Sequence, residues 1–143
     1  MGKTRRGAAT KLMAIADRHG LPVSATIASG ERHEVRLVEQ TLQARFTYDA
    51  PERLIGDRAY DSAKLEAELA SQGIELISPI RRGGSARWPD GRSFRRYKRR
   101  WKVERLFAWL LRNRRLTERY ERKAANFLGF VLLGCLKILL NHL

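Results

Sequence analysis

The chain has 143 residues, of which 43% are hydrophobic, enough for one domain with a hydrophobic core and too few for two comfortable ones. The 29 Lys and Arg residues outnumber 15 Asp and Glu, so the net charge is +14 and the expected partner is a polyanion such as nucleic acid. The single cysteine, Cys135, excludes an internal disulfide and suits a reducing cytoplasm, and the longest apolar run, residues 127–136, is too short to cross a bilayer. We therefore expect residues 1–143 to form a single cytoplasmic domain with no membrane partner.

The first half of the chain predicts two strands, a helix and a third strand, in that order. Apolar runs over residues 11–16 and 22–28 flank a polar turn that contains Gly20, a pattern typical of a β-hairpin. Residues 33–44 have apolar side chains at helical spacing, and residues 53–56 predict a short buried strand.

The second half predicts three helices and one more strand. A helix is expected over residues 62–71, with Asp61 or Ser62 as its N-cap and Gly73 at its end, followed by a strand over 74–78. Residues 81–91 are polar, basic and Gly-rich and predict a loop. One long helix is then expected over 93–115, and a last helix over 124–141, which is apolar nearly all round and should be buried.

Carboxylates at strand ends are the first candidates for chemistry, because phosphodiester reactions with two metal ions need acids that converge on the metals. Asp57 directly follows the apolar run Leu54-Ile55-Gly56, which would place it at the carboxyl end of a strand. An ordinary turn aspartate would show the same pattern.

Glu104 is the second candidate. In a continuous helix Tyr97, Arg100 and Glu104 have the spacing i, i+3, i+7 and would line one side, with Ala108 leaving room beside the carboxylate. The alternative is a surface ion pair between Glu104 and a neighbouring cation, which is a common and weak interaction.

A basic stretch with interleaved tryptophans is the third feature. From residue 81 to residue 122 there are sixteen Lys or Arg residues against four acids. Cations neutralise phosphates and aromatic rings stack on exposed bases, whereas the alternative for such a run is a solvated face. We expect core packing for Trp101 and Trp109, and a DNA contact for Trp88 in the polar loop.

Two blocks of the chain resemble a known family. Residues 56–62, Gly-Asp-Arg-Ala-Tyr-Asp-Ser, are similar to the block around the second catalytic Asp of bacterial insertion-sequence transposases, and residues 97–110 resemble the block around their catalytic Glu. Residues 114–116, 119–121 and 126–130 continue the similarity. The chain thus resembles the insertion-sequence-five group of transposases, which use two Asp and one Glu, over nearly its whole length.

The resemblance implies an α/β fold of the ribonuclease-H-like type, a mixed sheet with flanking helices, whose opening strand with the first catalytic Asp would lie before residue 1. It implies that Asp57 and Glu104 are ligands of Mg²⁺ (or Mn²⁺), with Arg100 and Tyr97 orienting the Glu or holding a phosphate. The Lys of the family signature falls on Leu111 here, and the arginine that follows is its candidate replacement. The residues expected to bind DNA are Arg81, Arg82, Trp88, Arg95, Arg96, Arg99 and Arg112.

The implied activity is DNA transposition, in which double-stranded element ends are cut and joined to target DNA. Because the first Asp is not in this chain, we expect it to be inactive alone, and the expected protein partners are a second copy or the product of an upstream reading frame. The alternative is a non-catalytic DNA-binding remnant or an inhibitor of the full transposase. A basic RNA-binding protein of the ribosomal kind would fit the charge but not the blocks around Asp57 and Glu104.

Overall fold

The computed structural model describes residues 2–4, 7–80 and 91–143 and divides the chain into two compact units. The first unit comprises Met1–Phe46 and Lys102–Leu143, and the second unit is Thr47–Trp101. The helices and strands confirm the mixed α/β prediction. In chain order, with η for 3-10 turns, they are β1 (Gly2–Thr4), β2 (Gly7–Ala16), β3 (Pro22–Ser29), η1 (Glu34–Leu37), α1 (Val38–Gln43), β4 (Arg53–Ile55), η2 (Arg58–Tyr60), α2 (Ala63–Ser71), β5 (Glu75–Ile77), α3 (Gly91–Tyr97), η3 (Lys98–Arg100), α4 (Trp101–Leu111), α5 (Arg114–Thr117) and α6 (Ala124–Leu140).

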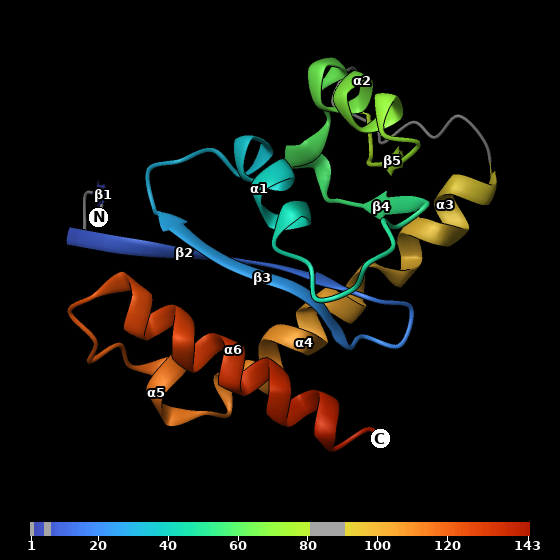
Figure 1. Ribbon diagram of the computed structural model, residues 1–143. Coiled ribbons are helices and arrows are strands. Elements are labelled where there is room, and N and C mark those ends of the chain that lie inside the picture. Colours follow the sequence, from blue (N-terminus) through green and yellow to red (C-terminus); the bar gives the residue numbers. More distant parts are fainter. Residues whose placement is uncertain (1, 5–6, 81–90) are drawn as a thin grey trace. The chain divides into compact units, whose positions relative to one another are not determined.

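The first unit is built on the antiparallel hairpin of β2 and β3, to which β1 adds a short third strand (Figure 1). The turn forms because the Asp17 carboxylate accepts hydrogen bonds from the backbone N–H groups of His19 at 2.7 Å and Leu21 at 2.8 Å. Gly20 has a φ of 81°, a left-handed conformation that glycine adopts without a Cβ clash. The predicted hairpin is confirmed, although β2 begins at Gly7 rather than at residue 11.

Helices α1 and α6 cover opposite faces of this hairpin (Figure 1). Side chains alternate between the faces of a strand, so Ala25 joins the core beneath α6 whereas Ser24 and Thr26 meet α1. The hydroxyl oxygens of Thr26 and Thr41 lie 2.9 Å apart, and Thr41 donates its own hydrogen to the Leu37 carbonyl at 2.7 Å. The buried polar groups between β3 and α1 are thereby paired with one another.

The core of the first unit lies between the hairpin and helices α4 to α6. Gly134 lets α6 approach α4 closely, because a Cβ at this position would lie 3.0 Å from Leu110 Cδ2. The buried residues of this core are Ala25, Leu106, Leu110, Leu116, Phe127, Val131, Cys135 and Ile138.

The second unit contains β4 and β5, which pair in parallel, with α2 as the crossover between them. Helix α2 begins where the Ser62 hydroxyl accepts a hydrogen bond from the Leu65 backbone N–H at 3.4 Å, and it ends before Gly73, whose φ is 75°. Leu65 and Leu69, four residues apart, are its buried side chains. The predicted cap, helix end and flanking strands are therefore confirmed.

The single long helix predicted over residues 93–115 is wrong. The chain there forms α3, the 3-10 turn η3, α4 and the short α5. At the end of α4 the Asn113 side-chain amide donates to the Leu110 carbonyl at 3.0 Å, and the same residue stands at the N-cap of α5. The side chain thus competes for the acceptor that a continuing helix would have used, which ends α4.

The last predicted helix is confirmed as α6, but its expected burial on all sides is wrong. One side packs into the core through Phe127, Val131, Cys135 and Ile138. The opposite side is exposed at Leu132, Leu133, Leu136 and Leu140. Among the residues that the structure describes, no helix has both the length and the apolar character needed to span a bilayer.

Candidate catalytic carboxylates and nucleic-acid interface

Asp57 stands directly after β4, at the carboxyl end of the parallel strand pair. The Gly56 N–H donates to the Ile77 carbonyl at 3.0 Å and so continues the ladder up to the residue before Asp57. A side chain at Gly56 would collide with the Tyr60 ring, because a Cβ would lie 2.8 Å from Tyr60 Cδ2. Gly56 therefore lets the chain fold back tightly behind the carboxylate.

One oxygen of the Asp57 carboxylate is held by the backbone. Oδ1 accepts a hydrogen bond from the Ala59 N–H at 2.7 Å and caps η2, while Oδ2 has no hydrogen-bond partner among the described residues. The side chain thus has the role of a turn aspartate and also presents an oxygen of the kind that divalent cations prefer. The strand-end position predicted for Asp57 is found.

Glu104 lies in the first turn of α4 in the first unit, and its side chain is exposed. Two cations beside it in sequence are used to attach α4 to the hairpin turn: Lys102 donates to the Arg18 carbonyl and Arg105 to the His19 carbonyl. The sequence pattern does not predict these two contacts. Its only signal is weak: a turn that contains a glycine in one part of the chain and a basic helix in another.

Tyr97 and Arg100 belong to the second unit, at the end of α3 and in η3, so the continuous helical face expected to carry them together with Glu104 is interrupted. Within that unit the Arg100 guanidinium lies 5.9 Å from the Tyr97 ring centroid, in the range of a cation–π contact. Asp57 is also part of the second unit, whereas Glu104 is part of the first. In the described ranges there is no group of three or more His, Cys, Asp or Glu that could hold a metal ion.

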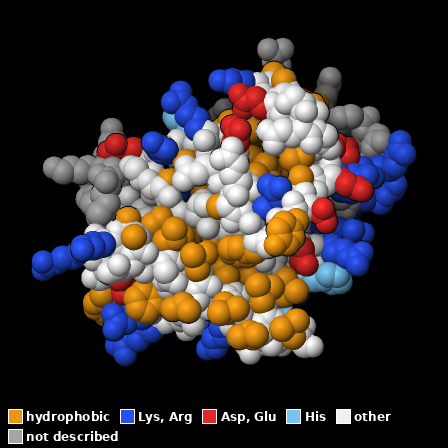
Figure 2. Space-filling model, in the orientation of Figure 1, with side chains coloured by type: hydrophobic (Ala, Val, Ile, Leu, Met, Phe, Trp, Pro, Cys, Tyr) orange, Lys and Arg blue, Asp and Glu red, His pale blue; other side chains and the backbone are white. Residues whose placement is uncertain are grey.

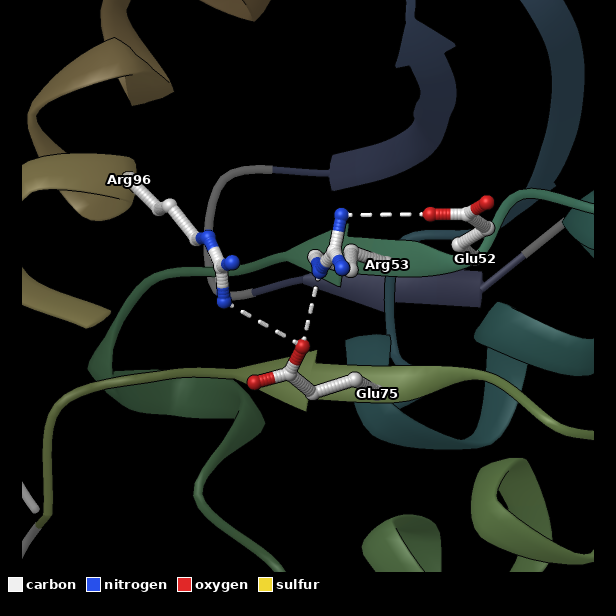
Figure 3. A network of polar contacts seen from close by, with 4 residues as sticks. All are labelled: Glu52, Arg53, Glu75 and Arg96. Carbon is white, nitrogen blue, oxygen red and sulfur yellow. Dashed lines mark hydrogen bonds and ion pairs between the residues drawn. The ribbon is translucent and has the colours of Figure 1, made fainter. Parts of the chain in front are cut away.

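The basic residues of α3 and η3 fall into two groups. Arg95 and Arg99 are exposed, and no ion pair engages them among the described residues. Arg96 instead contacts Glu75 Oε2 at 3.4 Å, and Arg53 from β4 contacts the same oxygen at 2.9 Å (Figure 3). Arg53 also pairs with Glu52 at 3.2 Å, so Arg96 is part of a network that attaches α3 to the strand pair.

The other predicted DNA-binding residues have different surroundings. Arg112 is exposed just after α4, while Arg81, Arg82 and Trp88 lie outside the described residues. Core packing was the wrong expectation for Trp101, which is 50% exposed, because the 3-10 turn before it ends the regular α3 face. Trp109 does pack against the core, with the Arg105 guanidinium 4.8 Å from its ring centroid.

Residues 2–140 match the family described as transposase DDE domain, and the chain belongs to that family. The resemblance to insertion-sequence transposases is thereby confirmed.

Two relatives show the same affiliation. The putative transposase for insertion sequence element IS402 from Burkholderia cepacia is 31% identical over 137 residues, which cover 90% of this chain and 62% of that protein. The putative transposase for insertion sequence element IS6501 from Brucella ovis is 30% identical over 132 residues, which cover 92% of this chain and 98% of that protein. The chain therefore spans less than two thirds of the first relative's length. No solved structure matches the chain.

Proposed function

We propose that this chain takes part in DNA transposition, as the portion of a catalytic domain that carries the second Asp and the Glu. The observation that carries the proposal is Asp57, which stands at the end of a parallel strand with one oxygen fixed by the Ala59 amide and the other unengaged. Membership of the transposase DDE domain family supports the same reading.

The proposed reaction is an in-line attack on a phosphodiester. Water attacks the phosphorus at an element end, a new P–O bond forms, and the 3′ oxygen leaves as a free hydroxyl. That hydroxyl then attacks a phosphorus of the target DNA and displaces another 3′ oxygen, so the number of phosphodiester bonds is conserved in the joining step. Arg100 and Tyr97 would hold a phosphate or orient Glu104.

Mg²⁺ or Mn²⁺ is the cofactor implied for this chemistry. The donor type fits, because Asp57 and Glu104 provide carboxylate oxygens and Asp57 Oδ2 is available, but the described residues do not gather three such acids. When bound, two such ions activate the attacking hydroxyl and stabilise the leaving oxygen. Asp57 and Glu104 would be two of the ligands, and the third carboxylate would come from a further segment.

The open edge of β2 offers a place for that segment. β1 pairs with β2 only over Gly7–Ala9, so beyond Ala9 this edge has no strand partner among the described residues. An unpaired edge of this kind is a template for another strand. An additional strand here would extend the sheet of the first unit toward the ribonuclease-H-like arrangement that the family resemblance implies.

The DNA-binding surface would include Arg95, Arg99 and Arg112, which are exposed, together with Arg81, Arg82 and Trp88. Such cations bind phosphates with a strong dependence on salt. Arg96 would contribute less, because Glu75 already neutralises it.

The direct test is strand transfer of a labelled element end in Mg²⁺ by the full-length transposase that contains this region. Asp57→Asn and Glu104→Gln should each abolish joining while DNA binding in a gel-shift assay is retained. Glu66→Gln, which changes an exposed acid on α2, is the matched control and should retain joining. Unchanged joining in both carboxylate variants would contradict the assignment.

A second function, a DNA-binding protein without catalysis, is favoured by the lack of a three-acid cluster in the described residues. In that case the 143-residue chain would bind element ends in a salt-dependent manner and would not nick them in Mg²⁺. Adding the chain to the full transposase distinguishes the two: a remnant that occupies ends inhibits joining, whereas a complementing half restores joining to a partner that lacks this region.

A further inference from the structure

Two aromatic side chains in the second unit are exposed and have no role in the proposed function. Phe94 in α3 is 41% exposed, and Trp101, the last residue of the unit, is 50% exposed. Tryptophan is highly buried on average, because most of its large surface is apolar. Two exposed rings on one short segment are therefore candidates for contact with a ligand. We call Phe94 and Trp101 the aromatic pair.

The 3-10 turn between the two rings keeps them on one side of the segment. A 3-10 turn advances the chain by about 120° per residue, whereas an α-helix advances it by about 100°. Because η3 occupies Lys98–Arg100, Trp101 lies about 40° from Phe94 around the helix axis and about 12 Å further along it. This distance corresponds to roughly three or four nucleotides of a strand with a rise of about 3.4 Å each.

The segment around the aromatic pair is strongly cationic. Residues 91–101 contain six Lys or Arg residues and no acid. Lys98 holds its ammonium nitrogen 4.8 Å from the centroid of the Phe94 ring, so one cation already lies against the aromatic pair. Figure 2 shows Lys and Arg side chains gathered on the surface where Figure 1 places α3. This charge favours a polyanion over an apolar protein as the ligand.

Aromatic rings beside cations suit a single strand of DNA better than a duplex. The bases of a duplex are paired and stacked on one another, so a protein ring reaches the face of a base only after that base has been unstacked. An unpaired base offers its face directly. Every base has such a face, so stacking on aromatic side chains requires no particular sequence.

From these features we propose that residues 91–101 form a binding site for single-stranded DNA. The rings of Phe94 and Trp101 stack on unpaired bases, and the cations of the segment neutralise the phosphates of the same strand. This role differs from the binding of duplex phosphates, because it requires bases that have left their pairs. That these bases are frayed nucleotides at an element end rests on the proposed function, whereas the binding of a single strand does not.

The experiment measures binding of the 143-residue chain to three fluorescent probes by anisotropy, with no divalent metal present. The probes are an oligothymidylate of about 12 nucleotides, an abasic strand with the same number of phosphates, and a duplex of the same length. The oligothymidylate should bind at least about fivefold more tightly than the abasic strand, because it alone offers bases to the rings. Equal affinities for these two strands would overturn the proposal.

Phe94→Ala and Trp101→Ala should each weaken binding of the oligothymidylate at least about fivefold and change binding of the other two probes by less than about twofold. The matched control is Tyr120→Ala in the first unit. Tyr120 is 59% exposed and has the Arg115 guanidinium 5.8 Å from its ring centroid, so it is also an exposed ring beside a cation. This control should bind all three probes as the wild type does. Circular dichroism shows whether each variant keeps its helices.

The abasic strand and the duplex decide what the rings contact. If the two alanine variants weakened binding of the abasic strand as much as binding of the oligothymidylate, the rings would contact no bases. If they weakened binding of the duplex as much, the rings would act on paired DNA. Either result would overturn the proposal.

Trp101→Phe tests stacking without removing the ring. This variant should retain most of the affinity for the oligothymidylate, but it should lose the quenching of tryptophan fluorescence that stacking on Trp101 produces. A variant as weak as Trp101→Ala, or a wild-type chain without quenching, would contradict the proposal. None of these assays measures cutting or joining, so their outcome does not depend on whether Asp57 and Glu104 bind metal.

Discussion

The Arg105 guanidinium occupies the space that a side chain at Gly20 would need. A Cβ on Gly20 would lie 2.5 Å from Arg105 Nη2, and Arg105 donates to the carbonyl of the neighbouring His19. Gly20 also has a φ of 81°, so two separate constraints act on one position of the β2–β3 turn.

Gly20→Ala should therefore destabilise the protein by more than about 1 kcal/mol, since alanine in the left-handed region is strained and its methyl group displaces Arg105. Gly73→Ala is the control, because Gly73 has a φ of 75° but no atom within 4 Å of its Cβ position, so only the backbone strain remains. Urea unfolding measures both. If Gly20→Ala lowers the free energy of unfolding by no more than Gly73→Ala does, the clash with Arg105 adds nothing to the backbone strain.

Thr41→Val should lower the free energy of unfolding by roughly 1–3 kcal/mol, because it leaves the buried Thr26 hydroxyl without the partner that lies 2.9 Å away. The double variant Thr26→Val with Thr41→Val should cost less than the sum of the single variants, since both polar partners are then replaced by methyl groups. Thermal or urea unfolding of the four proteins gives the coupling energy. Additive costs would mean that the two hydroxyls do not interact.

The two groups of arginines on α3 and η3 should differ in DNA binding. Arg95→Ala and Arg99→Ala should each reduce the slope of log binding constant against log salt by about 0.9, the value for one lost phosphate contact. Arg96→Ala should change the slope less, because Arg96 is already paired with Glu75 at 3.4 Å. Fluorescence anisotropy with a labelled duplex at several salt concentrations measures the slopes. If Arg96→Ala reduced the slope as much as the other two variants, the ion pair between Arg96 and Glu75 would have to break when the protein binds DNA.

Burial raises the pKa of the Cys135 thiol from its ordinary value near 9.0 to about 11. The thiol of the unfolded chain ionises near the ordinary pKa, whereas the buried thiol of the folded chain stays neutral to a higher pH. The stability that this difference contributes is therefore fully present below the ordinary pKa and is lost as the pH rises through the raised one. The free energy of unfolding should fall as pH rises from 9.0 toward 11, and Cys135→Ala should remove this part of the dependence. Urea unfolding of the wild-type protein and the Cys135→Ala variant between these pH values measures the effect. Tyrosines and lysines also titrate in this range, but they are the same in both proteins, so the difference between the two profiles reports on the thiol. Parallel pH profiles would contradict the predicted coupling.

Local signals in the sequence predicted local structure well. The turn at Asp17 and Gly20, the Ser62 cap and the helix end at Gly73 depend on residues a few positions apart, and the structure has them where they were expected. The strand-end position of Asp57 belongs to the same class, because an apolar run followed by a polar residue is a local pattern.

The wrong predictions concern features that hydrophobic periodicity does not encode, some of them local and some between residues distant in sequence. Helical periodicity continued through residues 98–100 and past Asn113, and it gave no sign that a 3-10 turn and a side-chain hydrogen bond would divide the helix. The apolar composition of α6 could not indicate which side the hairpin would cover. The attachment of Arg96 to Glu75 joins residues 21 positions apart, and a basic run alone does not reveal which of its members have acidic partners.

The first unit is formed from the two ends of the chain, with the second unit as a continuous insertion between them. The hairpin face that carries Ala25 is synthesised before the second unit, whereas the helix that covers this face, α6, is synthesised after it. Contacts between segments so distant in sequence slow folding and prolong the exposure of apolar surface. The second unit is synthesised in full during this interval, and the side of the hairpin that faces α6 stays uncovered until α6 follows.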